Sequence, residues 1–260
     1  MKLTGILEKL NELAPFEDAA PWDNSGLLVG RGDREVTKAV IALDARGDVI
    51  EKAIELKASL IVTHHPMIFG SVKKVNDSDF VGRRILALAE NNIALIAMHT
   101  NFDRHVMNAE AADMLGLKNK QPFAELKETA KGELGFGYIG ELPERMKLGE
   151  CVDRVKEVFG LKKADYFGSW ESEIFKAAIV SGSGAEFVDE AAGLGAQLLI
   201  TGDVKYHNGL DAVEKGICVI DAGHYGVEKL FVPYMMQFFE RRLPGMQAVD
   251  YGSLTPFGAV

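Results

Sequence analysis

Apolar positions in the first quarter of the chain recur with two different periods. Leucine and isoleucine stand three and four residues apart from Leu3 to Leu13, which predicts an amphipathic first helix that ends before Pro15. An apolar run at residues 36–43, a helical pattern at 47–57 and a second apolar run at 60–63 follow. A strand, a helix and a strand of these lengths predict a βαβ unit with parallel strands.

The same pattern returns in the second half of the chain. Residues 38–63 align with residues 176–201 without a gap. Shared periodicity alone can align two such units, but an ungapped register that ends on the same threonine favours an internal duplication. We therefore expect an α/β fold of two similar α/β lobes. The identical positions are Lys38/Lys176, Ala39/Ala177, Ile41/Ile179, Ala53/Ala191, Leu56/Leu194, Ala58/Ala196, Leu60/Leu198 and Thr63/Thr201.

The remaining elements follow from the same patterns. Charged residues 118–131 show no strong strand pattern and are the expected link between the halves. This places the first lobe at residues 1–122 with 224–260 and the second at residues 123–223. Further strands are predicted at residues 93–98, 135–142, 164–170, 198–200 and 217–220, and helices at 81–91, 148–159 and from His224 through Glu228 towards Phe239.

Two adjacent histidines end the strand at residues 60–63. In open α/β sheets ligands bind beyond the carboxyl ends of the strands, which is where His64 and His65 stand before Pro66. Neighbouring side chains of an extended chain point in opposite directions, so we expect the pair to hold two ions, one each. The alternative is a pair of hydrogen-bonded polar groups in the core. The duplicated segment has Gly202 and Asp203 at these positions, and this loss of the pair from one half favours a functional role.

Other polar clusters also follow predicted strands. Residues 99–103, 201–207 and 221–224 each come directly after an apolar run. His224 and Glu228 are four residues apart, so they share one face of a helix. Residues 21–30 run from a turn-rich segment of side-chain oxygens and amides into an apolar strand, and a surface turn is the alternative to a functional segment here. Residues 181–184 precede the second-copy helix, where they predict either a phosphate site or a plain strand-to-helix turn.

Residues from these strand ends form a candidate metal set. Three imidazoles and two carboxylates would overfill one tetrahedral zinc ion, whereas two ions roughly 3.5 to 4 Å apart and bridged by a carboxylate would use all five. Nitrogen and oxygen donors suit zinc, iron, manganese or nickel and do not distinguish among them. The set is His64, His65, Asp103, His224 and Glu228.

The order of these motifs resembles the Nif-three-like family, also called the dinuclear-metal or GTP cyclohydrolase type 2 family. The resemblance implies that the five residues above are dinuclear metal ligands and that His99, Thr100 and His207 line the pocket. It also implies two α/β lobes with the metal between them, assembled as a homohexamer. Some members carry an inserted domain, which this chain is too short to contain. The motifs are Pro21-Trp22-Asp23 to Gly30, Thr63 to Pro66, His99 to Asp103, Gly135 to Leu142, Thr201 to His207, and Gly223-His224 to Glu228.

Paired metal ions and this resemblance predict a metal-dependent hydrolase. Its small-molecule substrate would be a nucleotide, with hydrolytic attack at C8 of guanine, or a phosphoester, and His99 or His207 would transfer a proton. The first alternative is a non-catalytic metal-binding or regulatory adaptor. A nucleic-acid-binding ring is the other, but the formal charge of −9 and the lack of a lysine and arginine cluster count against it.

Composition indicates in which part of the cell we expect the protein to work. Neither a signal peptide nor a run of roughly 20 apolar residues is present, which predicts a soluble cytoplasmic protein without a membrane partner. Cys151 and Cys218 are far apart and outside any CxxC spacing, so we expect both to be small buried hydrophobic residues.

Overall fold

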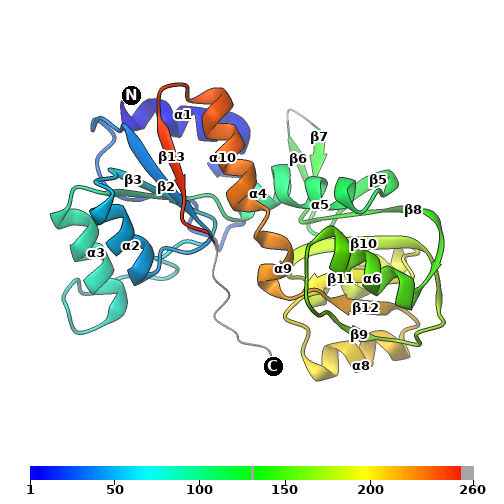
Figure 1. The fold of residues 1–260 in the computed structure, drawn as a ribbon. Coiled ribbons are helices and arrows are strands. Elements are labelled where there is room, and N and C mark those ends of the chain that lie inside the picture. Colours follow the sequence, from blue (N-terminus) through cyan, green and yellow to red (C-terminus); the bar gives the residue numbers. More distant parts are fainter. Residues whose placement is uncertain (130–131, 253–260) are drawn as a thin grey trace. The chain divides into compact units, whose positions relative to one another are not determined.

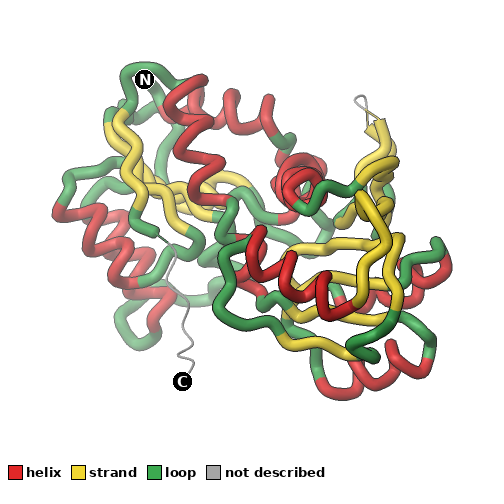
Figure 2. The backbone as a smooth tube through the Cα atoms, turned by 45° about the vertical axis from the view of Figure 1, so that its right-hand side comes forward, coloured by secondary structure: helices red, strands yellow, loops and turns green. Residues whose placement is uncertain are grey.

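The computed structural model describes residues 1–129 and 132–252, and the chain divides into two compact units (Figure 1). The first unit is Met1–Phe102 with Lys229–Val260, of which residues 253–260 lie outside the described part. The second unit is Asp103–Glu228. Each unit contains a β-sheet accompanied by helices, drawn in yellow and red in Figure 2, so the predicted α/β class is confirmed.

The first unit is built on a five-stranded sheet in the order β1-β4-β3-β2-β13. Its strands are parallel except β1, which pairs antiparallel with β4. The strands are β1 (Gly26–Val29), β2 (Lys38–Ala42), β3 (Leu60–Thr63), β4 (Ala94–Ala97) and β13 (Gln247–Asp250). The helices are α1 (Leu3–Leu13), η1 (Phe16–Asp18), α2 (Gly47–Glu55), α3 (Phe80–Glu90), α4 (Thr100–Phe102) and α10 (Phe231–Arg242).

Helices cover both faces of this sheet. Helices α1 and α10 lie on one side of β2 and β13, and α2 and α3 lie on the other (Figure 1). Every residue of β3 and β4 is buried, which explains why these strands have continuous apolar runs rather than alternating ones. The predicted first helix and first βαβ unit, β2-α2-β3, are confirmed.

The second unit contains a six-stranded sheet in the order β5-β8-β10-β11-β12-β9, with β10, β11 and β12 parallel, and a separate hairpin of β6 and β7. The strands are β5 (Lys118–Phe123), β6 (Lys127–Thr129), β7 (Gly132–Leu134), β8 (Gly137–Lys147), β9 (Asp165–Phe167), β10 (Glu173–Ser183), β11 (Leu198–Gly202) and β12 (Cys218–Asp221). The helices are the π-helix η2 (Asp103–Met107), α5 (Asn108–Met114), α6 (Leu148–Val158), η3 (Ala185–Phe187), α7 (Val188–Gly193), α8 (Tyr206–Glu214) and α9 (His224–Glu228).

The two βαβ segments share strand register as well as sequence. In each, the lysine aligned at the start of the segment donates from Nζ to a backbone carbonyl at the end of the crossover helix. This agreement supports the internal duplication, which stays a prediction. The matching contacts are Ala39 opposite Leu60, Ala177 opposite Leu198, Lys38 Nζ to Leu56 O at 2.8 Å and Lys176 Nζ to Leu194 O at 2.8 Å.

The expected link at residues 118–131 is wrong in its described part, because it contains β5 and β6. Strand β5 is at the edge of the sheet and, among the strands that the structure describes, pairs with β8 alone. An edge strand has less apolar surface to bury and tolerates proline, here Pro122, so its polar composition concealed it.

The helix expected to run from His224 towards Phe239 is also wrong, because it is two helices separated by Lys229 and Leu230. Pro233 lies in the first turn of α10 and has no amide hydrogen to donate to the carbonyl of Lys229, which favours a new helix start here. None of the helices formed by residues 1–129 and 132–252 has the length and apolar character needed to span a bilayer.

The helix start expected after residues 181–184 is wrong as well. Ser181 and Gly182 belong to the end of β10, and the 3-10 turn η3 precedes α7. The backbone amide of Ser181 donates to Asn108 Oδ1, and that of Gly184 donates to Thr201 Oγ1. Since these amides are already hydrogen-bonded within the protein, the plain-turn interpretation fits the segment better than a phosphate site.

Candidate functional site

His64 and His65 lie immediately after the carboxyl end of β3. The strand ends at Thr63, whose hydroxyl donates to the backbone carbonyl of His65 at 2.8 Å, and both histidines are in a bend. Side-chain alternation holds only for extended chain, so the expectation that the two imidazoles diverge is wrong. Their ring centroids are 5.0 Å apart, and a ligand nitrogen of each lies within 4.8 Å of the other and of one from His99.

Each of these three rings is oriented by a hydrogen bond at Nδ1. The partners are a backbone carbonyl and two carboxylates, which only accept, so Nδ1 holds a proton and Nε2 is the nitrogen left to bind a metal. Metal-binding histidines typically use their second nitrogen in this way. The donor chemistry therefore fits a divalent metal. The contacts are His64 with Met98 O, His65 with Asp44 Oδ1 and His99 with Asp23 Oδ1, each at 2.8 Å.

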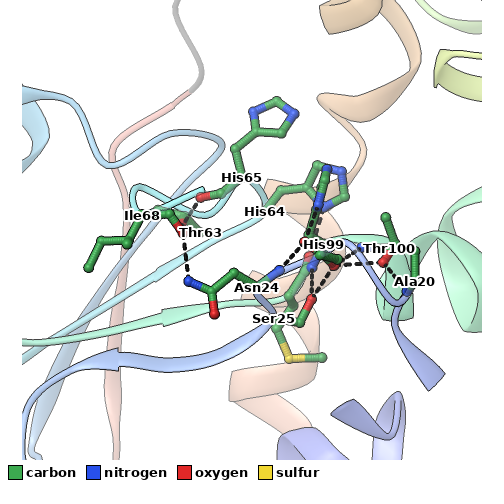
Figure 3. A network of polar contacts seen from close by, with 11 residues as sticks. Ala20, Asn24, Ser25, Thr63, His64, His65, Ile68, His99 and Thr100 are labelled. Atoms are coloured by element: carbon green, nitrogen blue, oxygen red, sulfur yellow. Dashed lines mark hydrogen bonds and ion pairs between the residues drawn. The ribbon is translucent and has the colours of Figure 1, made fainter. Parts of the chain in front are cut away.

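Asp23 is the centre of a polar network that includes His99, and Figure 3 labels Ser25, His99 and Thr100 of this network. Its buried carboxylate also accepts hydrogen bonds from the hydroxyl of Thr100 at 2.6 Å, the hydroxyl of Ser25 at 2.7 Å and the amide of Asn24 at 2.6 Å. Burial alone would raise the pKa of Asp23, but the hydrogen bonds from His99, Thr100 and Ser25 outweigh it and hold the pKa well below its usual value. The surface-turn interpretation of this segment is therefore wrong for Asp23.

In the second unit, His224 and Glu228 are the first and last residues of α9, which follows β12. His224 Nε2 lies 3.1 Å from Glu228 Oε2, as their spacing along one helical face predicts. Two ligand atoms of one tetrahedral zinc ion are roughly 3.3 Å apart when each bond is about 2.0 Å long, so the distance between these two side chains suits a shared ion. His224 Nδ1 lies 2.7 Å from Asp203 Oδ2, so this histidine also has a carboxylate at its second nitrogen.

The end of β10 contacts both predicted carboxylate ligands of this unit. A Cβ atom at Gly182 would lie 2.5 Å from Glu228 Oε1, so the absence of a side chain leaves room for that carboxylate. The Ser181 hydroxyl donates to Asp103 Oδ1 at 3.2 Å. The backbone amide of Ser181 donates to Asn108 Oδ1 at 2.7 Å, and Asn108 Nδ2 donates to the Ser181 hydroxyl at 3.0 Å. Asp103 is the first residue of η2, and π-helical turns are frequent at functional sites.

Most predicted site residues therefore group within their own unit. The first unit brings His64 and His65 together with His99, which Thr100 follows at the start of α4. The second brings Asp103, His224 and Glu228 to the end of β10. Among the described contacts of the second unit, none joins His207 to Asp103, His224 or Glu228. His207 is the exposed second residue of α8, and its ring packs edge-on against Tyr206.

The sequence interpretation gave no role to Asp44, nor to Asp23 and Ser25, although the last two lie in a motif that carries the family resemblance. Asp44 follows β2 closely, so the strand-end pattern that selected His64 could also have selected it. For Asp23 and Ser25 no local pattern indicates contact with a histidine more than 70 residues away.

Comparison with known proteins identifies relatives along almost the whole chain. The model of the family described as Duf34/NIF3 (NGG1p interacting factor 3) matches residues 1–252. A Clostridium acetobutylicum protein named "GTP cyclohydrolase 1 type 2 homolog" is 35% identical over 95% of this chain and 92% of its own length. A Helicobacter pylori protein named "GTP cyclohydrolase 1 type 2" is 38% identical over 87% of this chain and 86% of its own. The crystal structure of Staphylococcus aureus protein SA1388 covers 100% of this chain and 99% of its own, with 28% identity and a TM-score of 0.88.

Proposed function

The chain belongs to the Duf34/NIF3 family, and from this membership and the two clusters of metal-binding side chains we propose that it is a dinuclear metal-dependent hydrolase. The single observation that carries the proposal is the grouping of His64, His65 and His99, each with Nδ1 fixed by an acceptor. The substrate is a nucleotide or another phosphoester. The nucleotide is suggested by the names of relatives that are 35 to 38% identical.

The proposed ligands come from both units. His64 and His65 supply imidazole nitrogens, and Asp103, His224 and Glu228 supply an imidazole and two carboxylates. Such a set suits two divalent ions of zinc, iron, manganese or nickel. When bound, two ions of this kind lower the pKa of water towards neutrality and polarise the group under attack.

The protein's own residues would hold the ligands and move a proton. Asp44 and Asp203 act as positioning residues, since each fixes the ring of a proposed ligand, His65 or His224. His99 is held by Asp23, so its Nε2 can hold or transfer a proton near the nitrogens of His64 and His65. His207, at the exposed start of α8, is the second proposed proton carrier. The protein is further proposed to work as a cytoplasmic homohexamer on a small molecule, without a nucleic acid or membrane partner.

Metal analysis combined with turnover tests this proposal. Protein purified without added metal is expected to contain divalent metal and to hydrolyse GTP or a member of a phosphoester panel. His65→Ala and Glu228→Ala should lose metal and at least 100-fold of the turnover, about 2.7 kcal/mol of transition-state stabilisation. Glu240→Ala, which changes an exposed glutamate of α10, is the matched control and should keep both.

Two results would contradict the proposal. Full turnover after chelation would exclude metal-dependent hydrolysis. Metal that binds through these residues without turnover of any substrate would replace the hydrolase with the alternative, a metal-binding or regulatory adaptor.

A further inference from the structure

Two large aromatic side chains of the first unit are exposed and in contact with each other. Trp22 and Phe69 are each 57% exposed, and their rings stack at a centroid distance of 6.0 Å and an interplanar angle of 27°. Single exposed apolar residues are common on protein surfaces, whereas contiguous exposed apolar surface can mark a site of interaction. We refer to Trp22 and Phe69 as the aromatic pair.

Neighbouring residues hold the aromatic pair in place. Asp23, next to Trp22, is fixed by the buried network around His99, and Asn24 Nδ2 donates to the carbonyl of Ile68, next to Phe69, at 2.6 Å (Figure 3). The segments that contain the two rings are thus tied to each other and to the polar network. A ligand that stacks on rings held this way loses less affinity to their ordering than it would on a mobile loop.

The aromatic pair is next to the histidine cluster. His99 is edge-on to both rings, with centroid distances of 6.0 Å to Trp22 and 5.8 Å to Phe69 and interplanar angles of 74° and 72°. The His99 ring is in turn 5.2 Å from His64 and 5.6 Å from His65. A planar ring stacked on the pair would therefore lie beside His99, close to the imidazoles assigned to metal binding.

The loop that contains Phe69 also contains positive charge, which is complementary to a phosphate. Lys73 and Lys74 are exposed in the loop that continues from Phe69, although the whole chain has a formal charge of −9. Aromatic faces bind the bases of nucleotides by stacking, and lysine ammonium groups bind their phosphates. A nucleotide has both a base that can stack and a phosphate. Of the two base types, a purine has the larger face to place on the aromatic pair.

We propose that Trp22 and Phe69 form a stacking platform for the base of a purine nucleotide beside His99. This inference rests on the proposed function, because it assigns a substrate class to the same site. It identifies two substrate-binding residues that supply affinity for the base and take no part in proton transfer or metal binding.

The affinities of the metal-loaded protein for guanosine 5′-monophosphate and ribose 5-phosphate test the platform, because only the first ligand has a base to stack. By calorimetry, Trp22→Ala and Phe69→Ala should each weaken binding of the nucleotide by roughly 5- to 100-fold. Trp22→Phe and Phe69→Tyr, which keep a ring, should retain most of the affinity. Binding of ribose 5-phosphate should be the same in all variants.

Phe80→Ala is the matched control. Phe80 is also 57% exposed in the first unit, but its ring packs against Arg84 on α3. Its removal should leave the affinity for the nucleotide unchanged. A second measurement leaves Trp22 intact: with Trp170→Phe, Trp22 is the sole tryptophan, and its fluorescence should be quenched by guanosine 5′-monophosphate.

Three results would overturn the platform. These are wild-type nucleotide affinity in both alanine variants, absence of quenching, and a change in oligomeric mass of the alanine variants with unchanged nucleotide affinity. The last result would assign the aromatic pair to an interface between copies of the chain. Because binding is measured without turnover, the two proposals can fail separately. If the aromatic pair is needed for nucleotide binding but the protein hydrolyses no substrate, only the proposed hydrolase function is contradicted. If the alanine variants hydrolyse a base-free phosphoester and bind the nucleotide with wild-type affinity, only the stacking platform is contradicted.

Discussion

The carboxylate of Asp23 lies 2.8 Å from Nδ1 of His99, although 76 residues separate the two in the chain. The carboxylate side chain is completely buried and the imidazole is 12% exposed. Because an ionised carboxylate in such a place is stable only while it is hydrogen-bonded, this contact links the folding of the first unit to the orientation of its histidine cluster.

Replacing Asp23 by asparagine should lower stability in a pH-dependent way. Hydrogen bonds hold the pKa of Asp23 below its ordinary value of 3.8, so its stabilising effect is fully present above pH 3.8 and is lost as the pH falls below it. We expect Asp23→Asn to reduce the free energy of unfolding by about 1–3 kcal/mol at pH 7, measured in urea. The difference in free energy of unfolding between this variant and the wild type should become smaller below pH 4. Asp33→Asn, at an exposed aspartate of the same unit, should show neither effect.

Removing the carboxylate behind His65 should weaken metal binding without removing a ligand. Asp44→Asn replaces a charged acceptor of the Nδ1 hydrogen with a neutral amide, which lowers the basicity of the ring. We expect metal affinity to fall by about 10-fold or more, measured by competition with a chelator. Asp48→Asn is the control, because Asp48 pairs with Arg46 at 2.6 Å, and its metal affinity should be that of wild type. Equal affinities in the two variants would remove Asp44 from the positioning role.

A side chain at Gly182 should displace a proposed ligand. Gly182 has φ +66°, and a Cβ there would meet Glu228 Oε1 at 2.5 Å. Gly182→Ala should lose stability through backbone strain of about 1–2 kcal/mol and should also lose metal. Gly195→Ala, at φ +82° with open space around it, should show the same strain and keep its metal content. Wild-type metal content in Gly182→Ala would show that Glu228 is not displaced or is not a ligand.

Cys151 should be unreactive in the folded protein. Burial, with the charge of Glu150, raises the pKa of this thiol to about 11. A thiol whose pKa is raised by folding stabilises the fold below the pKa of the unfolded chain, about 9, and loses that effect as the pH rises towards 11. A thiol reagent at pH 8 should label Cys151 only after urea is added, as judged by mass spectrometry. Fast labelling of the native protein would contradict this burial.

The sequence was sufficient wherever the determining pattern is local. The period of the apolar residues predicted α1 and the strands β2 and β3, and the end of an apolar run located the histidine pair. The four-residue spacing of His224 and Glu228 predicted a contact that the structure contains. Each of these features is fixed by residues only a few positions apart.

The sequence was insufficient where a residue's partner is distant in the chain. The divergence expected of His64 and His65 assumed that the strand continues, but the backbone bends at its end. Residues 118–123 of the charged segment form β5 because β8 supplies hydrogen-bond partners for them. A turn-forming sequence such as Trp22-Asp23-Asn24 does not indicate which histidine its carboxylate will contact.

The α/β class, the positions of the central strands and the candidate ligands at the strand ends follow from local patterns, because side-chain periodicity and backbone propensity act over a few residues. The folded chain alone shows that Asp23 orients His99, that Asp44 orients His65 and that Gly182 makes room for Glu228. These contacts depend on which strands pair and on where each one ends. Hydrogen bonding between strands far apart in the sequence sets both.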